Sequence, residues 1–227
     1  MSSKWLEWSQ QLQAIAQNGF AYCQNPYDLE RYEQMRQIAA EIMAAHIGVE
    51  PSFVYSLFEQ EEGYATPKVD VRGAVFREDK ILLVKEREDG RWTLPGGWVD
   101  VGESPSQAVE REVYEESGYQ TKATKLLALF DRNHARHGHP PFRHHVYKLF
   151  FHCEILDSGI LDSEILDGAL QESHKSENHE SENHETEAVA FFAEHQIPEL
   201  SLTRVMPTQI ARLFEHLRHP DWATDFD

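Results

Sequence analysis

The sequence lacks the features that would place it in a membrane or in an oxidising compartment. Its 227 residues contain only two cysteines, Cys23 and Cys153, without paired spacing, so no disulfide is expected. No apolar run approaches the roughly 18 residues of a membrane span. Residues 1–11 have no apolar core typical of a signal peptide. These absences predict a cytoplasmic protein with reduced thiols.

Positive charge is also scarce. Lys and Arg total 21 against 39 Asp and Glu, which gives a formal net charge of −18. A surface of this sign repels anionic membranes and long nucleic acids, so neither is expected as a partner. A chain this acidic that handles phosphates must recruit positive charge, most simply as a divalent metal ion.

The first 64 residues predict a small all-α domain. Apolar residues recur at helical spacing within 5–15 and 32–45, and Pro26 and Pro51 suit the first turn of a helix. Short helices bury little surface alone. Their apolar stripes must pack on each other, on the rest of the chain or on a second subunit, and we expect a homodimer formed through this domain.

Residues 65–227 predict a second domain of mixed α and β structure, so the fold class is α+β. Two helices are expected at about 104–117 and 207–219. Strands are expected at 69–76, 81–84, 125–130, 145–153 and 188–192. A low-complexity insertion at about 157–184 repeats Ser-Glu-Asn-His-Glu in tandem and predicts a surface loop, with a metal-binding His/Glu tract as the alternative.

A glycine-rich loop precedes the first helix of this domain. Gly96 and Gly97 follow a proline and allow both a tight turn and a close approach of the backbone to a ligand. Ser104 and Pro105 then provide a cap and a first-turn proline, and Gly118 is placed to end the helix.

That helix carries an acidic face. Glu112, Glu115 and Glu116 fall within roughly 100° of arc. The like-charged pair Glu112 and Glu116 costs ~0.2–0.5 kcal/mol, and acids near a helix C-terminus are disfavoured by ~0.3–1 kcal/mol. A hard divalent cation removes this conflict, because Mg²⁺ prefers carboxylate oxygens. A solvated acidic face is the alternative interpretation.

The spacing of these residues resembles the Nudix box, the signature of the Nudix hydrolases. Gly97 is followed after five residues by Glu103, and after seven more by Arg-Glu-Val-Tyr-Glu-Glu-Ser-Gly at 111–118. Tyr119 stands where the family usually has an aliphatic residue, a difference that concerns packing rather than ligands. The flanking strings at 66–72, 147–151 and 200–205 are similar to a bacterial subgroup with a helical N-terminal segment, resembling pyrophosphatases of ADP-ribose or CDP-choline type.

The resemblance implies a Nudix fold, an α/β/α sandwich around a mixed sheet. It also implies Mg²⁺-dependent hydrolysis, with Mn²⁺ as a substitute, of a nucleoside diphosphate linked to another moiety X. The small nucleotide substrate would give a nucleoside monophosphate and phosphorylated X. The residues implied for the metal site are Glu112, Glu115, Glu116, Glu103 as an accessory ligand, and Gly97.

Catalytic roles are implied for Glu116, Glu115 and Arg111, with Arg111 bracing the glutamates. We favour Glu116 as general base, with Glu185 and Glu187 as alternatives that border the repeat and could simply be solvated. Arg72, Gly96 and Arg132 are candidate substrate-binding residues, although an ion pair within the sheet would equally explain Arg72. The histidine-rich stretch 134–145 fits a zinc site, a substrate-facing loop or a polar hairpin.

Two other classes of function compete with this interpretation. One is a hydrolase of RNA 5′ ends or of oxidised nucleotides on the same fold. The other is a nucleotide-binding regulator without catalysis, which would be expected to lose box carboxylates that are all present here.

Overall fold

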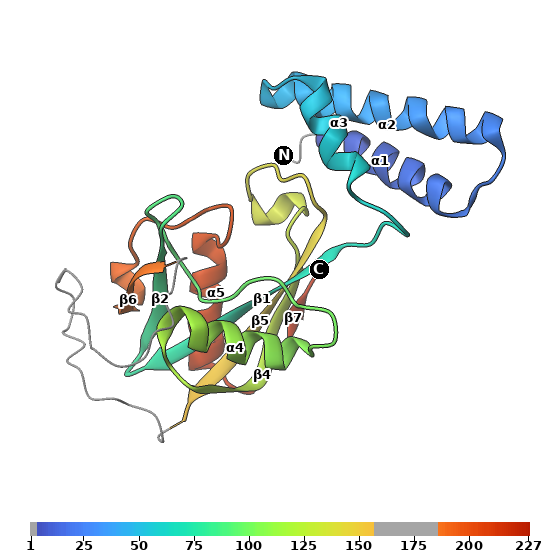
Figure 1. Cartoon of the computed structure of the whole chain (residues 1–227). Helices are drawn as coiled ribbons and strands as arrows, with labels where there is room; N and C mark the ends of the chain where they lie inside the picture. Colours follow the sequence, from blue (N-terminus) through green and yellow to red (C-terminus); the bar gives the residue numbers. More distant parts are fainter. Residues whose placement is uncertain (1–3, 157–185) are drawn as a thin grey trace, which may run out of the picture. The chain divides into compact units, whose positions relative to one another are not determined.

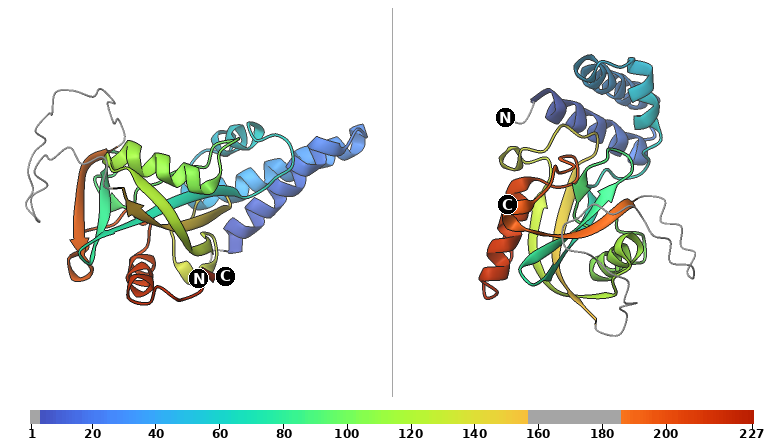
Figure 2. Two further views of the ribbon diagram at one scale, coloured as in Figure 1. Left: turned by 90° about the horizontal axis from the view of Figure 1, so that it is seen from below. Right: turned by 90° about the vertical axis from the view of Figure 1, so that its left-hand side faces the viewer.

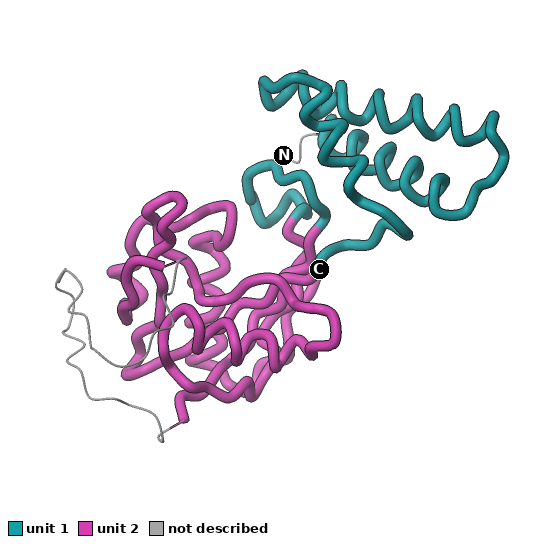
Figure 3. The backbone as a smooth tube through the Cα atoms, viewed as in Figure 1, with its two compact units in different colours: residues 1–68, 133–145 teal, residues 69–132, 146–227 magenta. Residues whose placement is uncertain are grey.

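The computed structural model describes residues 4–156 and 186–227 (Figure 1). The predictions about the insertion at 157–184, about its His/Glu tract and about Glu185 lie outside the described residues. The chain divides into two compact units (Figure 3): a helical unit of residues 1–68 and 133–145, and a sheet unit of residues 69–132 and 146–227. No helix within the described ranges has the length and apolar character needed to cross a membrane.

The predicted all-α segment consists of the α-helices α1 (Lys4–Tyr22), α2 (Pro26–Ile47) and α3 (Pro51–Glu59). The side chain of Asn25 caps α2 by accepting from the N–H of Tyr27, and Gly48 ends it with φ 73°. The buried side chains between the helices are Ala39, Ala40, Met43, Ala44, Val54 and Phe58.

The loop at 133–145, within the stretch 65–227 that the sequence predicts as the second domain, groups with the helical unit. The physical reason lies in hydrogen bonds to α1. The Gln10 amide donates to the carbonyl of Phe142 at 3.0 Å, and Asn133 donates to the Gln10 side chain at 3.4 Å. A short 3₁₀ helix, η1 (Ala135–His137), lies within this loop.

The sheet unit has the predicted α/β/α layers (Figure 2). The strands run in the order β3-β2-β1-β5-β4-β7, and β6 also pairs with β2. Helix α4 (Pro105–Ser117) lies on one face and α5 (Pro207–Arg218) on the other. The strand bounds are β1 (Lys68–Arg77), β2 (Lys80–Glu86), β3 (Trp92–Thr93), β4 (Thr121–Asp131), β5 (Val146–Ile155), β6 (Thr186–Ala193) and β7 (Asp225–Phe226).

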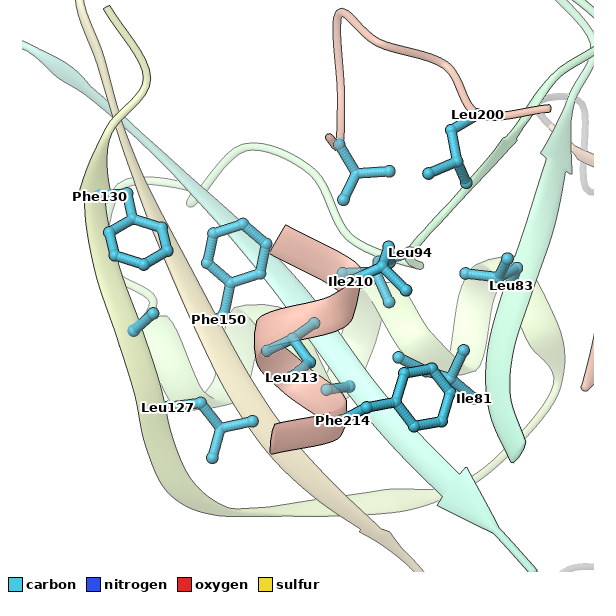
Figure 4. Close-up of a cluster of buried hydrophobic side chains, with 13 residues drawn as sticks. Ile81, Leu83, Leu94, Leu127, Phe130, Phe150, Leu200, Ile210, Leu213 and Phe214 are labelled. Atoms are coloured by element: carbon cyan, nitrogen blue, oxygen red, sulfur yellow. The ribbon is translucent and has the colours of Figure 1, made fainter. Parts of the chain in front are cut away.

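Alternating residues of the central strands supply the two cores. In β2, Ile81 and Leu83 join the cluster on the α5 side, and Leu82 joins the cluster on the α4 side. Figure 4 shows the first cluster, in which Leu213 and Phe214 of α5 pack among strand residues. The sheet therefore presents two apolar faces, and each helix covers one.

The chain segment 92–99 lies between β1 and β2, which pair with each other only near their connecting turn. On one side β3 pairs with β2 through Val84 and Thr93. On the other side the N–H groups of Gly73 and Val71 donate to the carbonyls of Pro95 and Gly97, both at 2.8 Å. Backbone bonds from two strands thus hold the glycine-rich loop in place.

Candidate active site

Helix α4 is fixed at both ends and packs closely on the sheet. A capping box joins Ser104 and Gln107 at its start, and Gly118 ends it with φ 76°. A Cβ at Gly73 of β1 would lie 2.5 Å from a methyl group of Val113, so only glycine allows this approach. The helix therefore presents its acidic last turns to the glycine-rich loop.

Each glycine of the loop meets one glutamate. Gly96 has φ 140°, and its N–H donates to Oε2 of Glu116 at 3.0 Å. A Cβ at Gly96 would lie 2.0 Å from the carbonyl oxygen of Val71. A Cβ at Gly97 would lie 3.0 Å from both carboxylate oxygens of Glu112. The loop and the helix thus bring together Gly96, Gly97, Glu112 and Glu116.

Arg111 joins the other carboxylates. Its Nε and Nη2 donate to the two oxygens of Glu103, both at 3.0 Å, and its Nη1 donates to Glu112 at 2.8 Å and to Glu115 at 2.9 Å. The hydrogen bonds from Arg111 lower the pKa of Glu103. One guanidinium therefore holds three carboxylates together, which fits the bracing role implied for Arg111.

Glu116 is the most buried of these acids, with 7% of its surface exposed. Burial raises its pKa to about 8, and the nearby charges of Glu112 and Glu86 add to the rise. Arg72 and the Gly96 N–H act in the opposite direction. Burial also raises the pKa of Glu112. Ionised carboxylates at these positions need additional positive charge.

The carboxylates suit a divalent cation in their chemistry. The donors are all oxygens, which Mg²⁺ and Mn²⁺ prefer, and glycine leaves space beside Glu112 that a Cβ would occupy. Within the described part of the chain, no group of three or more His, Cys, Asp and Glu is arranged to hold a metal ion. Glu103, Glu112 and Glu115 contact Arg111 instead. The interpretation of 134–145 as a zinc site gains no support from the described residues.

The candidate substrate-binding arginines both lie buried in the sheet unit. Arg72 donates from Nε and Nη2 to the two oxygens of Asp70, at 3.0 and 2.8 Å, and from Nη1 to the carbonyl of Leu94 at 3.1 Å. The ion pair within the sheet is therefore present, and Asp70 raises the pKa of Arg72. Arg132 donates to the carbonyl of Thr203 from Nε and Nη2, both at 3.2 Å.

Glu187 forms an ion pair at the start of β6. Its carboxylate pairs with Lys85 of β2 at 3.0 Å. The preceding residue, Thr186, donates to the main-chain oxygen of Glu116 at 3.2 Å. Glu187 itself lies at an irregularity in the pairing of β6 with β2, between the pairs Lys85–Ala188 and Glu86–Thr186.

Sequence reasoning missed three buried charged residues near the site: Asp70, Glu86 and Lys148. Glu86 ends β2 and pairs with Arg204 at 3.1 Å. Lys148 donates to Asp70 at 2.6 Å. Strand alternation was the available signal, because Lys148 falls on the same face as Phe150, which is fully buried.

Comparison with known proteins identifies both parts of the chain. The family described as the NUDIX domain matches residues 66–213, and the family described as the UDP-X-like, N-terminal oligomerisation domain matches residues 3–58. A Bacillus subtilis protein named "Putative ADP-ribose pyrophosphatase YjhB" is 42% identical over 227 residues, which is 100% of this chain and 99% of that protein.

Two solved structures are similar. An ADP-ribose pyrophosphatase from Streptococcus suis is 36% identical with a TM-score of 0.55, covering 71% of this chain and 100% of its own. A UDP-X diphosphatase is 29% identical with a TM-score of 0.56, covering 100% of this chain and 99% of its own. With its box residues assembled around α4, this chain belongs to the Nudix hydrolase family and is a pyrophosphohydrolase.

Proposed function

We propose that the protein hydrolyses the pyrophosphate bond of a nucleoside diphosphate linked to another moiety, with ADP-ribose or CDP-choline as the leading substrate types. One observation carries the proposal: the box glutamates lie against the glycine loop, where the N–H of Gly96 donates to the buried carboxylate of Glu116. Full-length similarity to the protein named for ADP-ribose hydrolysis supports ADP-ribose.

Nudix hydrolases generally use divalent metal ions, and we propose Mg²⁺ or Mn²⁺ here. Glu112, Glu115 and Glu116 would hold the ion beside Gly97, with Glu103 as an accessory ligand. When bound, such an ion neutralises phosphate oxygens and lowers the pKa of a coordinated water. Arg111 would position the carboxylates for such an ion, through the hydrogen bonds that it donates to Glu103, Glu112 and Glu115.

The remaining chemistry belongs to the protein's own side chains. Water attacks one phosphorus in line, the bond from that phosphorus to the bridging oxygen breaks, and a nucleoside monophosphate and phosphorylated X leave. Glu116 accepts the proton of the attacking water, because its carboxylate lies at the loop where the substrate would approach. Arg72 and Arg132 orient the phosphoryl groups, and Gly96 allows the substrate to approach the backbone.

The test is a metal-supplemented assay with products identified by mass. Hydrolysis of ADP-ribose or CDP-choline with millimolar Mg²⁺ and its loss in excess EDTA are expected. Glu115→Gln and Glu116→Gln should lower kcat by orders of magnitude. Glu110→Gln is the matched control on the same helix, because Glu110 pairs with Lys122 outside the cluster. Full activity in EDTA would refute the proposal.

A UDP-linked substrate is the second candidate. The UDP-X diphosphatase matches nearly the full length of both chains, and the N-terminal family is described as UDP-X-like. The same assay with UDP-sugars decides between the bases. RNA with a 5′-triphosphate and oxidised nucleoside triphosphates belong in the panel, and nucleotide binding without any product would favour the regulator.

We also propose a homodimer formed through the helical unit. Trp8, Ile15 and Tyr22 recur every seven residues along α1 and are 55%, 50% and 72% exposed. An apolar stripe of this kind suits a second copy of the same helix. Sedimentation should give twice the chain mass, and Ile15→Asp should give the monomer. A wild-type monomer at micromolar concentration would contradict the proposal.

A further inference from the structure

Four charged side chains lie buried together on the α5 face of the sheet. Asp70 and Arg72 come from β1, Lys148 from β5, and Arg132 follows β4, so three neighbouring strands supply them. Their exposed fractions are between 2% and 5%. The backbone N–H of Arg132 donates to the carbonyl of Val146 at 2.9 Å, which holds the end of β4 beside the start of β5.

This group contains more positive than negative charge. Arg72 and Lys148 both donate hydrogen bonds to the carboxylate of Asp70. The negative charge of Asp70 also favours the charged form of Arg132. Glu116 and Glu86 act electrostatically on Arg72 as well. Arg72 and Lys148 are thus two buried cations that share one carboxylate, whereas each buried charge normally has a partner of its own.

The ammonium group of Lys148 is incompletely hydrogen-bonded. It has three N–H donors, and Asp70 Oδ1 at 2.6 Å is its acceptor among the described residues. Buried donors almost always have partners. Burial, together with the charges of Arg72 and Arg132, lowers the pKa of Lys148 to about 7. An anion beside Lys148 would accept hydrogen bonds from its remaining donors.

We propose that Lys148, with Arg72 and Arg132, forms an anion subsite that binds a phosphoryl group of the substrate. The chemistry fits a phosphate, because guanidinium groups and an ammonium donate charge-assisted hydrogen bonds to its oxygens. Arg72 donates to the carbonyl of Leu94, and the N–H of Gly96 donates to Glu116, so the segment 94–96 links the subsite to the helix glutamates. The identity of the natural ligand rests on the proposed function, whereas the subsite itself does not.

Inorganic pyrophosphate in EDTA is the probe, so that no metal ion contributes to binding. Calorimetry and thermal unfolding of the full chain are compared for wild type, Lys148→Met and Lys122→Met. Lys122 is the matched control, a lysine on the neighbouring strand β4 whose side chain is 62% exposed. Pyrophosphate should raise the Tm of wild type and of K122M above that in NaCl of equal ionic strength. K148M should bind pyrophosphate at least about tenfold more weakly, which is the loss of one charge-assisted hydrogen bond.

Steady-state kinetics give a second measurement, because a purely structural role of Lys148 would not change KM and kcat to different extents. With the active substrate, K148M should raise KM at least about tenfold and change kcat much less. Equal pyrophosphate affinity in folded K148M and wild type would overturn the subsite and indicate a buried water beside Lys148. Absence of any pyrophosphate effect on wild-type Tm would overturn it even if K148M does not fold. Pyrophosphate binding without nucleotide hydrolysis would reject the proposed function alone.

Discussion

The two loop glycines should respond very differently to the same small substitution. In Gly96→Ala the alanine must adopt the φ of 140° that Gly96 has, a backbone conformation that is strained for L-amino acids and costs about 1–3 kcal/mol. Its Cβ would lie 2.0 Å from the backbone oxygen of Val71, which cannot rotate away. Displacing the strand adds about 1–3 kcal/mol. We expect Gly96→Ala to lose about 2–6 kcal/mol of a total near 5–15 kcal/mol.

Gly97→Ala should leave the fold intact and damage the site. Its Cβ would lie 3.0 Å from the Glu112 carboxylate, the far end of a flexible side chain, and no positive φ is required. The free energy of unfolding should change by less than about 1 kcal/mol. The displaced carboxylate should weaken Mg²⁺ binding and lower kcat by about tenfold or more.

Urea unfolding followed by circular dichroism measures the first effect, and Mg²⁺ calorimetry with turnover of the active substrate measures the second. Each variant is the control for the other, since both add one methyl group to adjacent residues. Equal unfolding midpoints for Gly96→Ala and wild type would refute the reasoning from backbone conformation. If Gly97→Ala binds Mg²⁺ as tightly as the wild type does, the space left by Gly97 beside Glu112 does not determine the position of that carboxylate.

Three further predictions follow from burial. The pKa of Glu116 is about 8 in the folded metal-free chain and 4.5 in an ordinary glutamate, so unfolding releases a proton at pH values between the two. The free energy of unfolding should therefore fall as pH rises from 4.5 to about 8 and level off above that. Urea titrations in EDTA should show this fall, and E116Q should reduce it. Burial raises the pKa of Cys153 to about 12, so iodoacetamide at pH 8 should label the native chain at Cys23 alone. Detection of a second label on the native chain by mass spectrometry would contradict this. Phe214→Ala, at a site 2% exposed, should cost about 3–5 kcal/mol of stability, whereas Leu202→Ala, at a site 44% exposed, should stay within about 0.5 kcal/mol by thermal unfolding.

The sequence predicts best where one short pattern determines the structure. The caps of α4 and the spacing of its glutamates are local, and the helix begins and ends within a residue of the prediction. By contrast, β3 and β7 contain two residues each, too few for any periodicity. The position of segment 92–99 between β1 and β2 depends on backbone pairing between separated segments, which side-chain patterns do not record.

The same distinction applies to the site. Glu112 and Glu116 meet the loop because helix geometry and the glycines bring them there. The direction of Glu187 depends on the register of β6 against β2, which the sequence leaves open. The contact between Lys148 and Asp70 joins residues 78 positions apart and depends on which strands are neighbours. Sequence alternation could have shown that Lys148 faces inward, but not what it meets there.

The last strand of the sheet has a consequence for biosynthesis. β7 pairs in parallel with Ala128 and Leu129 of β4, and the Thr224 hydroxyl donates to the carbonyl of Leu126, 98 residues earlier. At about 5–20 residues per second, the ribosome needs several seconds to supply that partner. Until then the outer edge of β4 remains open to pairing with another nascent chain. Translation that stops before residue 224 leaves that edge permanently exposed and should yield aggregates.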